Sequence, residues 1–181
     1  MKSRYTVVIV GATAVLSWWL LSTEQNKQST KIYDNHFIDL FINNFTLTST
    51  DKSGNTAYTL NATRLEHYND EDHSKIITPT IRLPQDDNSW LINATVGKID
   101  NDQNIITLRN NVTMEQIDSD DTFIITTEEM TIDTETKIIE SSEEVNIQNG
   151  SLQLKSTGMI FDGQQKKLKL LSNVSSVYAP L

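Results

Sequence analysis

The feature that most constrains the fold is an internal repeat of about thirty residues. The segment Trp90–Ile106 aligns without gaps onto the segment Phe123–Ile139. A third, slightly shorter copy runs from Leu152 to Leu168, and a slipped earlier copy begins at Tyr58. A unit of this length cannot bury its apolar face alone and does so by stacking on its neighbours. The chain is therefore expected to form a stack of like units.

Each copy alternates apolar and polar side chains with a period of two, which is typical of strands. Polar turns separate the strands, and Asp100 and Asp133 open equivalent turns, where a carboxylate can bond to the backbone two residues on. No helix is expected after residue 36. The pattern predicts an all-β domain of short antiparallel strands over residues 36–181, built as a sandwich, a jellyroll or a solenoid-like β-taco.

Alternation also predicts which side chains face the interior. They form either a dry core or the lining of an apolar groove, and the residues by themselves favour the dry core. The predicted inward side chains are Phe45, Leu47, Tyr58, Leu60, Trp90, Ile92, Leu108, Val112, Ile132, Val145, Ile147, Leu152, Leu154, Phe161, Leu168 and Leu170.

The N-terminal region predicts a membrane anchor. Residues 5–23 carry no charge, and Lys2 and Arg4 precede them. This length is near the lower limit for a membrane-spanning helix, and the positive-inside rule places residues 1–4 in the cytoplasm. Residues 24–35 then form a polar linker to the domain. The alternative, a cleaved signal peptide, is disfavoured because Trp18 and Trp19 are bulky where a cleavage site needs small residues.

The charge of the chain limits its partners. Lys2 and Arg4 are two of 15 basic residues, so 13 basic residues stand against 24 acidic ones in the rest of the chain. This balance argues against nucleic acid as a partner, and against electrostatic adsorption of the domain to anionic headgroups. The sequence has no cysteine, which excludes disulfides, thiol catalysis and cysteine-ligated zinc.

Signals for catalysis are poor, and the sequence predicts a protein that is not an enzyme and needs no metal or cofactor. His36, His67 and His73 do not follow a metal-ligand spacing. The acidic clusters 70–73 and 100–104 are interpreted as solvated turns, since the second lacks the glycine and distal glutamate of a calcium loop. A membrane-bound hydrolase is an alternative that no clustered acid pair supports.

The last predicted strand, Val174–Tyr178, has no turn after it. A terminal strand of this kind can leave a sheet edge that pairs with another β protein, or an edge that its polar residues protect. Both interpretations stay open from the residues alone.

The order of these features resembles the LptC family, and the resemblance covers essentially the whole chain. An anchor precedes β repeats that contain Gly54 with Tyr58–Leu60, Tyr68–Asp70, Pro79, Trp90 with Ala94 and Gly97, Leu108 with Asn111–Val112, Val145 with Ile147, and Gly150 with Leu152. The periplasmic bridge component LptA shares the β repeat but has a cleavable signal peptide, so the uncleaved anchor favours LptC.

The resemblance implies a twisted antiparallel jellyroll, or β-taco, whose lumen holds the acyl chains of lipopolysaccharide. It implies a single-pass inner-membrane protein with a periplasmic domain. Its partners would be the transporter subunits LptB, LptF and LptG at the N-terminal edge and LptA at the C-terminal edge. It reverses the preference for a dry core, and makes the inward residues candidate lipid contacts.

On this interpretation Phe45 lies at the entry and Tyr178 at the exit of the lumen. Gly54 and Gly150 serve turns, and Val174 and Val177 face a partner. Two alternatives remain: a scaffold or other anchored β-domain that does not bind lipid, and an adhesin or carbohydrate-binding module, which the scarcity of aromatic residues disfavours.

Overall fold

The computed structural model describes residues 37–68, 72–85, 88–100, 102–117 and 123–178. All of them belong to one of two compact units, His36–Leu181. The predicted anchor, residues 5–23, and the predicted linker, residues 24–35, lie outside the described residues. Among the described residues no helix has the length and apolar character needed to cross a membrane.

The described elements are eleven strands, so the all-β prediction is confirmed. Their bounds are β1 Ile38–Thr50, β2 Thr56–Tyr68, β3 His73–Ile77, β4 Thr80–Pro84, β5 Ser89–Asn93, β6 Val96–Asp100, β7 Ile105–Ile117, β8 Phe123–Asp133, β9 Ile138–Asn149, β10 Leu152–Asp162 and β11 Lys167–Tyr178. Every pairing between them is antiparallel.

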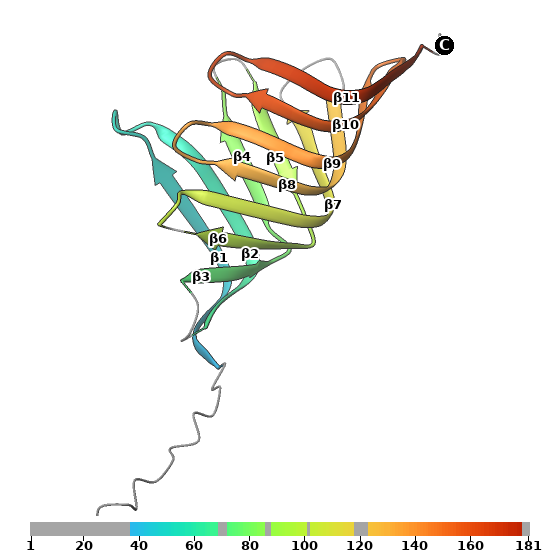
Figure 1. Ribbon diagram of the computed structural model, residues 1–181. Helices are drawn as coiled ribbons and strands as arrows, with labels where there is room; N and C mark the ends of the chain where they lie inside the picture. The colour runs from blue at the N-terminus through green and yellow to red at the C-terminus, as the bar shows by residue number, and fades with distance from the viewer. Residues whose placement is uncertain (1–36, 69–71, 86–87, 101, 118–122, 179–181) are drawn as a thin grey trace, which may run out of the picture. The chain divides into compact units, whose positions relative to one another are not determined.

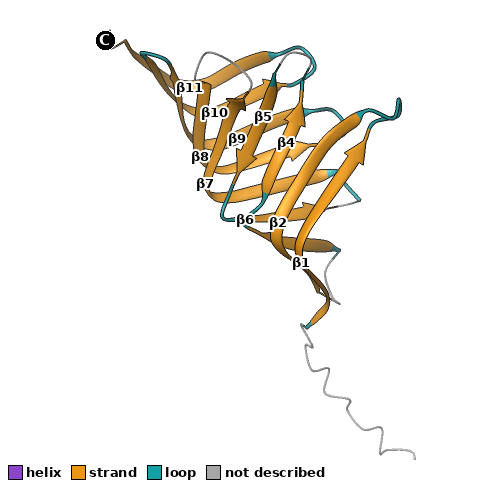
Figure 2. Ribbon diagram, turned by 180° about the vertical axis from the view of Figure 1, so that it is seen from behind, coloured by secondary structure: helices purple, strands orange, loops and turns teal. Residues whose placement is uncertain are grey.

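The strands form one sheet that folds back on itself into two layers. The first half of β7 pairs with β6 and its second half with β5, while β2 pairs with β4 and then with β3. We call the layer that contains β3 and β6 layer A, and the layer that contains β4 and β5 layer B. Figure 1 shows layer A in front, and Figure 2 shows layer B from behind. Strands β1 and β11 are the two edges.

The long strands bend where they pass from one layer to the other. Asn44 in β1, Asn110 and Asn111 in β7, Gly158 in β10 and Asn173 in β11 have φ angles between 48° and 81°. Asparagine and glycine tolerate this left-handed region better than other residues. The register of β7 against β8 and of β10 against β11 shifts at the same places. These bends form a corner that joins the layers.

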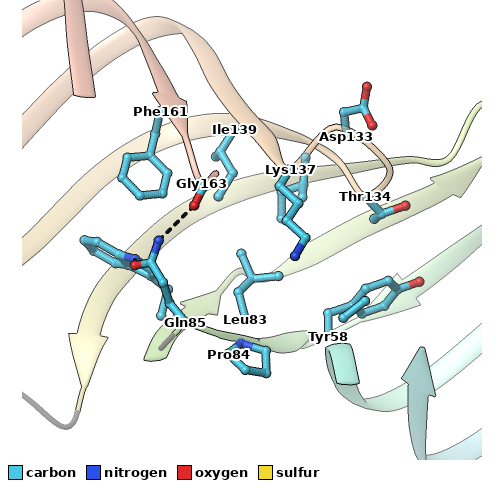
Figure 3. Close-up of a pocket in the computed structure, with 13 residues that line it drawn as sticks. Tyr58, Leu83, Pro84, Gln85, Asp133, Thr134, Lys137, Ile139, Phe161 and Gly163 are labelled. Carbon is cyan, nitrogen blue, oxygen red and sulfur yellow. Dashed lines mark hydrogen bonds between the residues drawn. The ribbon is translucent and has the colours of Figure 1, made fainter. Parts of the chain in front are cut away.

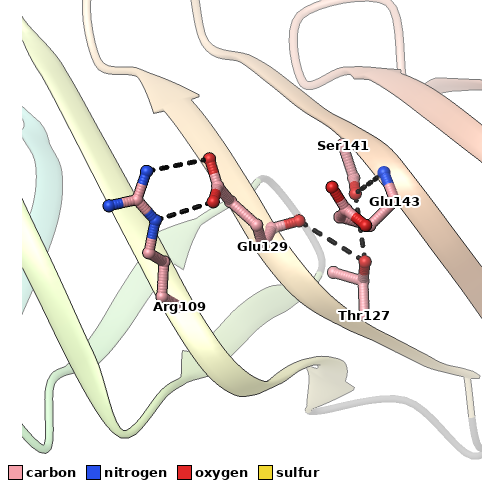
Figure 4. A network of polar contacts seen from close by, with 5 residues as sticks. All are labelled: Arg109, Thr127, Glu129, Ser141 and Glu143. Atoms are coloured by element: carbon pink, nitrogen blue, oxygen red, sulfur yellow. Dashed lines mark hydrogen bonds and ion pairs between the residues drawn. The ribbon is translucent and has the colours of Figure 1, made fainter.

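Hydroxyl groups complete the corner where the strand ladder is interrupted. The buried hydroxyls of Thr127 and Ser141 lie 3.0 Å apart, and the backbone nitrogen of Glu143 donates to Ser141 Oγ at 3.1 Å (Figure 4). Ser156 Oγ donates to the carbonyl oxygen of Gly158 at 3.1 Å. Among the described residues no buried side-chain nitrogen or oxygen lacks a partner. Bending at the corner therefore leaves no such polar atom without a hydrogen bond.

The repeat appears in the structure with one difference between copies. Trp90–Ile106 makes two short strands, β5 and β6, whereas Phe123–Ile139 makes the continuous strand β8 and the start of β9. The break in the first copy lies opposite Thr78 and Pro79, where β3 and β4 are also separate. Proline has no backbone N–H to donate to a ladder, and Ala94 instead donates to the Pro79 carbonyl at 3.2 Å.

The aspartate turns are as predicted. Asp133 Oδ1 accepts hydrogen bonds from the backbone nitrogens of Glu135 and Thr136, both at 2.9 Å. Asp162 makes the equivalent bonds to the nitrogens of residues 164 and 165, and Asp100 bonds to the nitrogen of Gln103. All three turns connect strands at the side of layer A that lies away from the corner.

Candidate functional site

The interior between the layers is the candidate site, and most predicted inward side chains lie in it. Nine of them are buried and others pack against that core from half-buried positions. The buried ones are Leu60, Trp90, Ile92, Leu108, Val112, Ile132, Val145, Ile147 and Phe161, and the packed ones are Phe45, Tyr58, Leu154, Leu168 and Leu170. The interior is apolar from the β1 side to the β11 side.

The remaining candidates lie at the edges and turns. Leu152 is half-buried at the start of β10. Leu47 in β1 and Tyr178 in β11 are 39% and 70% exposed, so both lie outside the packed interior. The backbones of Gly54 and Gly150 are left-handed, with open space around the position of a Cβ atom, which fits the predicted turn role.

Both edge strands expose apolar side chains. Strand β11 exposes Leu171, Val174, Val177 and Tyr178, and β1 exposes Leu40, Phe41, Ile42 and Leu47, with Phe37 just before it. Among the described strands β1 pairs only with β2 and β11 only with β10. An exposed apolar edge of this kind is a template for pairing with another sheet.

The interior is filled rather than hollow in this structure. Twelve large side chains, among them Ile76, Ile81, Met114 and Met159, are less than 2% exposed. An apolar cavity with a volume of about 40 Å³ lies at the side away from the corner, between Tyr58, Leu83, Trp90 and Phe161 (Figure 3). That is room for water but not for a ligand, since ligand pockets hold roughly 300–1,000 Å³.

We call this side of the domain the mouth, because there the turns of layer A face those of layer B. Gln85, between β4 and β5, donates from Nε2 to the carbonyl oxygen of Gly163 in layer A at 2.9 Å (Figure 3). Its Oε1 accepts from Trp90 Nε1 at 3.1 Å. One glutamine thus holds a core tryptophan and the opposite layer together.

Grooves continue the cavity along the mouth in both directions. One, of about 450 Å³, lies between the β1–β2 turn and the β8–β9 turn, where Lys52 Nζ is 3.8 Å from a Glu135 carboxylate oxygen. The other, of about 290 Å³, shares Gln85, Trp90 and Phe161 with the cavity. Because the Lys52–Glu135 pair is exposed, it contributes little stability. The Gln85 contact is therefore the firmer link across the mouth.

Aromatic side chains pack against each other beside the cavity at the mouth. The Trp90 ring meets the rings of Phe123 and Phe161 edge-on, with centroids 5.7 Å and 5.2 Å away. Such pairs stabilise a site by about 0.5–1.5 kcal/mol beyond their buried area. Trp90 comes from layer B and Phe161 from layer A, so this contact also joins the layers.

Sequence reasoning missed several interior residues. Ile125 and Ile139 were absent from the predicted set, although the gapless alignment pairs them with Ile92 and Ile106, and all four are buried. Carrying the inward assignment of Ile92 to the next copy would have found Ile125, whereas Ile106 and Ile139 were both absent from the set. Gln85 has no such signal, because its role depends on a contact 78 residues away in sequence.

Among the described residues no group of three or more histidine, cysteine, aspartate or glutamate side chains could hold a metal ion. The carboxylates with a clear pKa shift serve turns. The backbone N–H of Thr136 holds the pKa of Asp133 below its ordinary value, and the backbone N–H of Asn55 does the same for Asp51.

Comparisons with known proteins agree with this architecture. The model of the family described as "Lipopolysaccharide-assembly, LptC-related" matches residues 6–179. The chain belongs to the LptC-related family. Membership gives this LptC-related protein a role in lipopolysaccharide transport and a place in the cell envelope. A search of curated proteins finds none that matches the sequence.

A solved structure supports the fold of the LptC-related domain. The crystal structure of LptH from Pseudomonas aeruginosa, described as the LptA-homologous periplasmic component of the lipopolysaccharide transport device, matches with a TM-score of 0.53. The two sequences are 9% identical, and the match covers 68% of this chain and 95% of that one. At this identity the likeness concerns the fold, which is jellyroll-like in both proteins.

Proposed function

We propose that this LptC-related protein is a lipid conduit. In this proposal it receives lipopolysaccharide from an inner-membrane ABC transporter and passes it to a periplasmic bridge protein, with the acyl chains between the two layers. The observation that supports it most is an apolar interior that reaches from one exposed sheet edge to the other. A neighbouring jellyroll paired at either edge would extend that interior.

A filled interior means that lipid enters only if the layers separate. The mouth is the side where separation breaks the fewest contacts, because the strand ladders cross the corner and side chains cross the mouth. Each buried methylene of an acyl chain gains about 0.8 kcal/mol. A loaded chain would be held firmly, so its onward movement would need work from the transporter.

We propose the N-terminal strand β1 as the edge that docks on the transporter, LptF and LptG with their ATPase LptB, and β11 as the edge that docks on LptA. We further propose residues 5–23 as the single inner-membrane span and a periplasmic site for the domain. Extraction of native membranes with alkaline carbonate tests the span: the chain should stay in the membrane pellet. Release into the supernatant would contradict the proposal.

Site-specific photocrosslinking tests the conduit. A photoreactive residue would be placed at Phe45 or Leu154, which face the interior, or at their outward neighbours Thr46 and Lys155. In membranes that hold the transporter, lipopolysaccharide adducts are expected at the inward positions only, and only with ATP. Adducts at Phe45, in β1, should precede those at Leu154, in β10 beside β11.

A second candidate function, a scaffold that stabilises the transporter without touching lipid, is favoured by the filled interior. The same experiment separates the two. An assembled complex with no adduct at either inward position would establish the scaffold and contradict the conduit.

A further inference from the structure

The outer face of layer A carries a basic patch that the lipid path does not use. Lys75 in β3 and Lys98 in β6 are direct cross-strand neighbours, and Lys98 lies opposite Thr107 in β7. These side chains point outward, because the alternate residues Ile76 and Leu108 are buried. They line a groove of about 330 Å³ on the surface.

The two lysines have no ion-pair partner among the described residues. Like charges directly opposite each other on a sheet are destabilising. Their concentration in one place calls for an anion from outside.

Two acidic side chains beside the patch are already engaged. Glu66, opposite Lys75, accepts from Arg64 Nε at 2.7 Å and from the Tyr68 hydroxyl at 3.2 Å. Asp100 accepts from the backbone nitrogen of its own turn at 3.1 Å.

A third carboxylate nearby, that of Glu129, binds the Arg109 guanidinium through both oxygens (Figure 4). This contact raises the pKa of Arg109 and makes it a partner of Glu129 rather than a free cation. Lys75 and Lys98 thus remain as the cations directed at the groove.

The patch lies where the chain enters the domain. Ile38, at the start of β1, pairs with Tyr68, which lines the groove. Phe41 belongs to the same outward row as Glu66, Lys75 and Lys98, and the residue is 56% exposed. Figure 1 shows β3 and β6 at the same end of the sheet as the start of β1.

We propose that this face, centred on Lys75 and Lys98, docks on the anionic phospholipid headgroups of the membrane that holds the N-terminal segment. Residues 24–37 span at most roughly 50 Å when extended, so the patch stays close to that membrane. Cations beside an exposed aromatic ring suit a headgroup layer. The acidic remainder of the domain is repelled by the same surface, which orients the patch toward it.

This docking goes beyond the conduit and rests only on the proposed anchor. It would set the side on which the domain lies on the bilayer before any partner binds. The net charge argued against adsorption of the domain to anionic headgroups. The position of the lysines limits that expectation, because an acidic protein adsorbs to an anionic surface if its few cations lie on one face.

The full chain in lipid nanodiscs tests the proposal. The sequence has no cysteine, so a single cysteine at Thr107, or at Thr113 as control, gives one fluorescent label. Both threonines point outward from β7, the first in layer A and the second in layer B. A spin-labelled phospholipid in the disc reports contact by quenching.

In discs of equal phosphatidylcholine and phosphatidylglycerol, the label at residue 107 should be quenched more strongly than the label at 113. Quenching should vanish in phosphatidylcholine alone. It should also fall as salt rises from about 0.1 M to about 1 M, where the screening length drops from about 10 Å to about 3 Å. The double change Lys75→Gln and Lys98→Gln should lower the docked-to-undocked ratio about 30-fold.

The change Lys155→Gln with Lys169→Gln, at exposed positions on β10 and β11, removes the same charge and should leave the quenching intact. Equal quenching in both lipid mixtures, or none at residue 107 in discs that carry the protein, would overturn the docking. Quenching in phosphatidylcholine discs that needs added lipopolysaccharide would also overturn it, since the anion would then be the cargo. Protein that fails to enter the discs would instead count against the anchor.

Discussion

At the scale of single residues, the positions that shape this domain are those where a strand must bend or turn. A carboxylate or a left-handed backbone fixes most of them. The aspartate turns could be predicted from the sequence, because the bond from Asp to the following backbone is local. The corner asparagines could not, because Asn is common in this chain and only the layer crossing gives Asn110 and Asn111 their role.

The Asp133 carboxyl is expected to make the stability of the domain fall as the pH falls through the acid range. Hydrogen bonds from the backbone of Thr136 and Glu135 lower its pKa below 3.8 in the folded state. Its contribution is therefore complete above the unfolded pKa and is lost as the pH falls through the lower folded pKa. Asp133→Asn should make the urea midpoint less sensitive to pH below about 4.

The change Asp102→Asn, at an exposed turn position, removes the same charge and serves as control for that measurement. If the urea midpoint of Asp133→Asn falls with decreasing pH as steeply as that of the unchanged protein, the Asp133 carboxylate does not contribute to stability.

Substitution of two glycines with left-handed backbones is expected to lower the free energy of unfolding by different amounts. Gly158 has a φ of 81°, and an added Cβ would lie 2.8 Å from Leu171 Cδ1 and 3.3 Å from the Ser141 carbonyl oxygen. Gly150 has a φ of 55° with no atom within 4 Å of that position. Gly150→Ala should cost somewhat more than about 1 kcal/mol in free energy of unfolding, from the backbone alone.

Gly158→Ala should add about 1–3 kcal/mol of overpacking to the backbone cost. Denaturant unfolding compares the two variants, and equal costs would refute the crowding at the corner. Gly150→Arg has space at its turn, so the domain should stay folded. A copurification assay then shows whether that turn takes part in docking.

At the scale of elements, the edge strands differ from the rest. Alternation in the sequence predicted the interior strands well, because burial on one face imposes it. It predicted less at β1 and β11, where Leu47 and Tyr178 follow the pattern yet lie exposed. An edge strand has a neighbour on one side only, so half of the packing that makes alternation informative is missing until a partner binds.

Reciprocal edge substitutions are expected to separate the two docking events. Val177→Lys places a charge among the exposed apolar side chains of β11, and Leu40→Lys does so in β1. Val177→Lys should reduce binding of the bridge protein at least tenfold and leave the transporter complex intact, and Leu40→Lys should do the reverse. Pull-down with each partner checks both, each variant being the control for the other. Loss of both interactions in either variant would point to misfolding.

At the scale of the whole molecule, the resemblance read from the sequence and the family match agree on a role in lipopolysaccharide transport. What the sequence could not decide was whether the interior is hollow. Alternation places the same side chains inward in a packed core and in a lumen. The difference depends on the separation of the layers, which contacts distant in sequence, such as Gln85 to Gly163, control.

The Gln85 link predicts a variant that loads lipid too easily. Gln85→Leu removes the bond to Gly163 and leaves Trp90 Nε1 without its acceptor, which should cost about 1–3 kcal/mol of stability. Adducts of lipopolysaccharide at Phe45 should then form faster and without ATP. Gln164→Leu removes a bond of similar length, from Gln164 Nε2 to Thr136 O, that stays within layer A.

Gln164→Leu should leave ATP dependence unchanged, and the same photocrosslinking time course compares the two. An unaltered ATP requirement in Gln85→Leu would mean that the mouth does not limit loading.

With two exposed edges, the domain is comparable to a monomer that can react at both ends. A unit with one reactive group at each end has a functionality of two, and such units grow into linear chains by heterologous contacts that do not close. Chain length is then set by units that can react at one end only. A unit tethered beside its first strand has that end committed, so it acts as the initiator from which a chain of known direction grows.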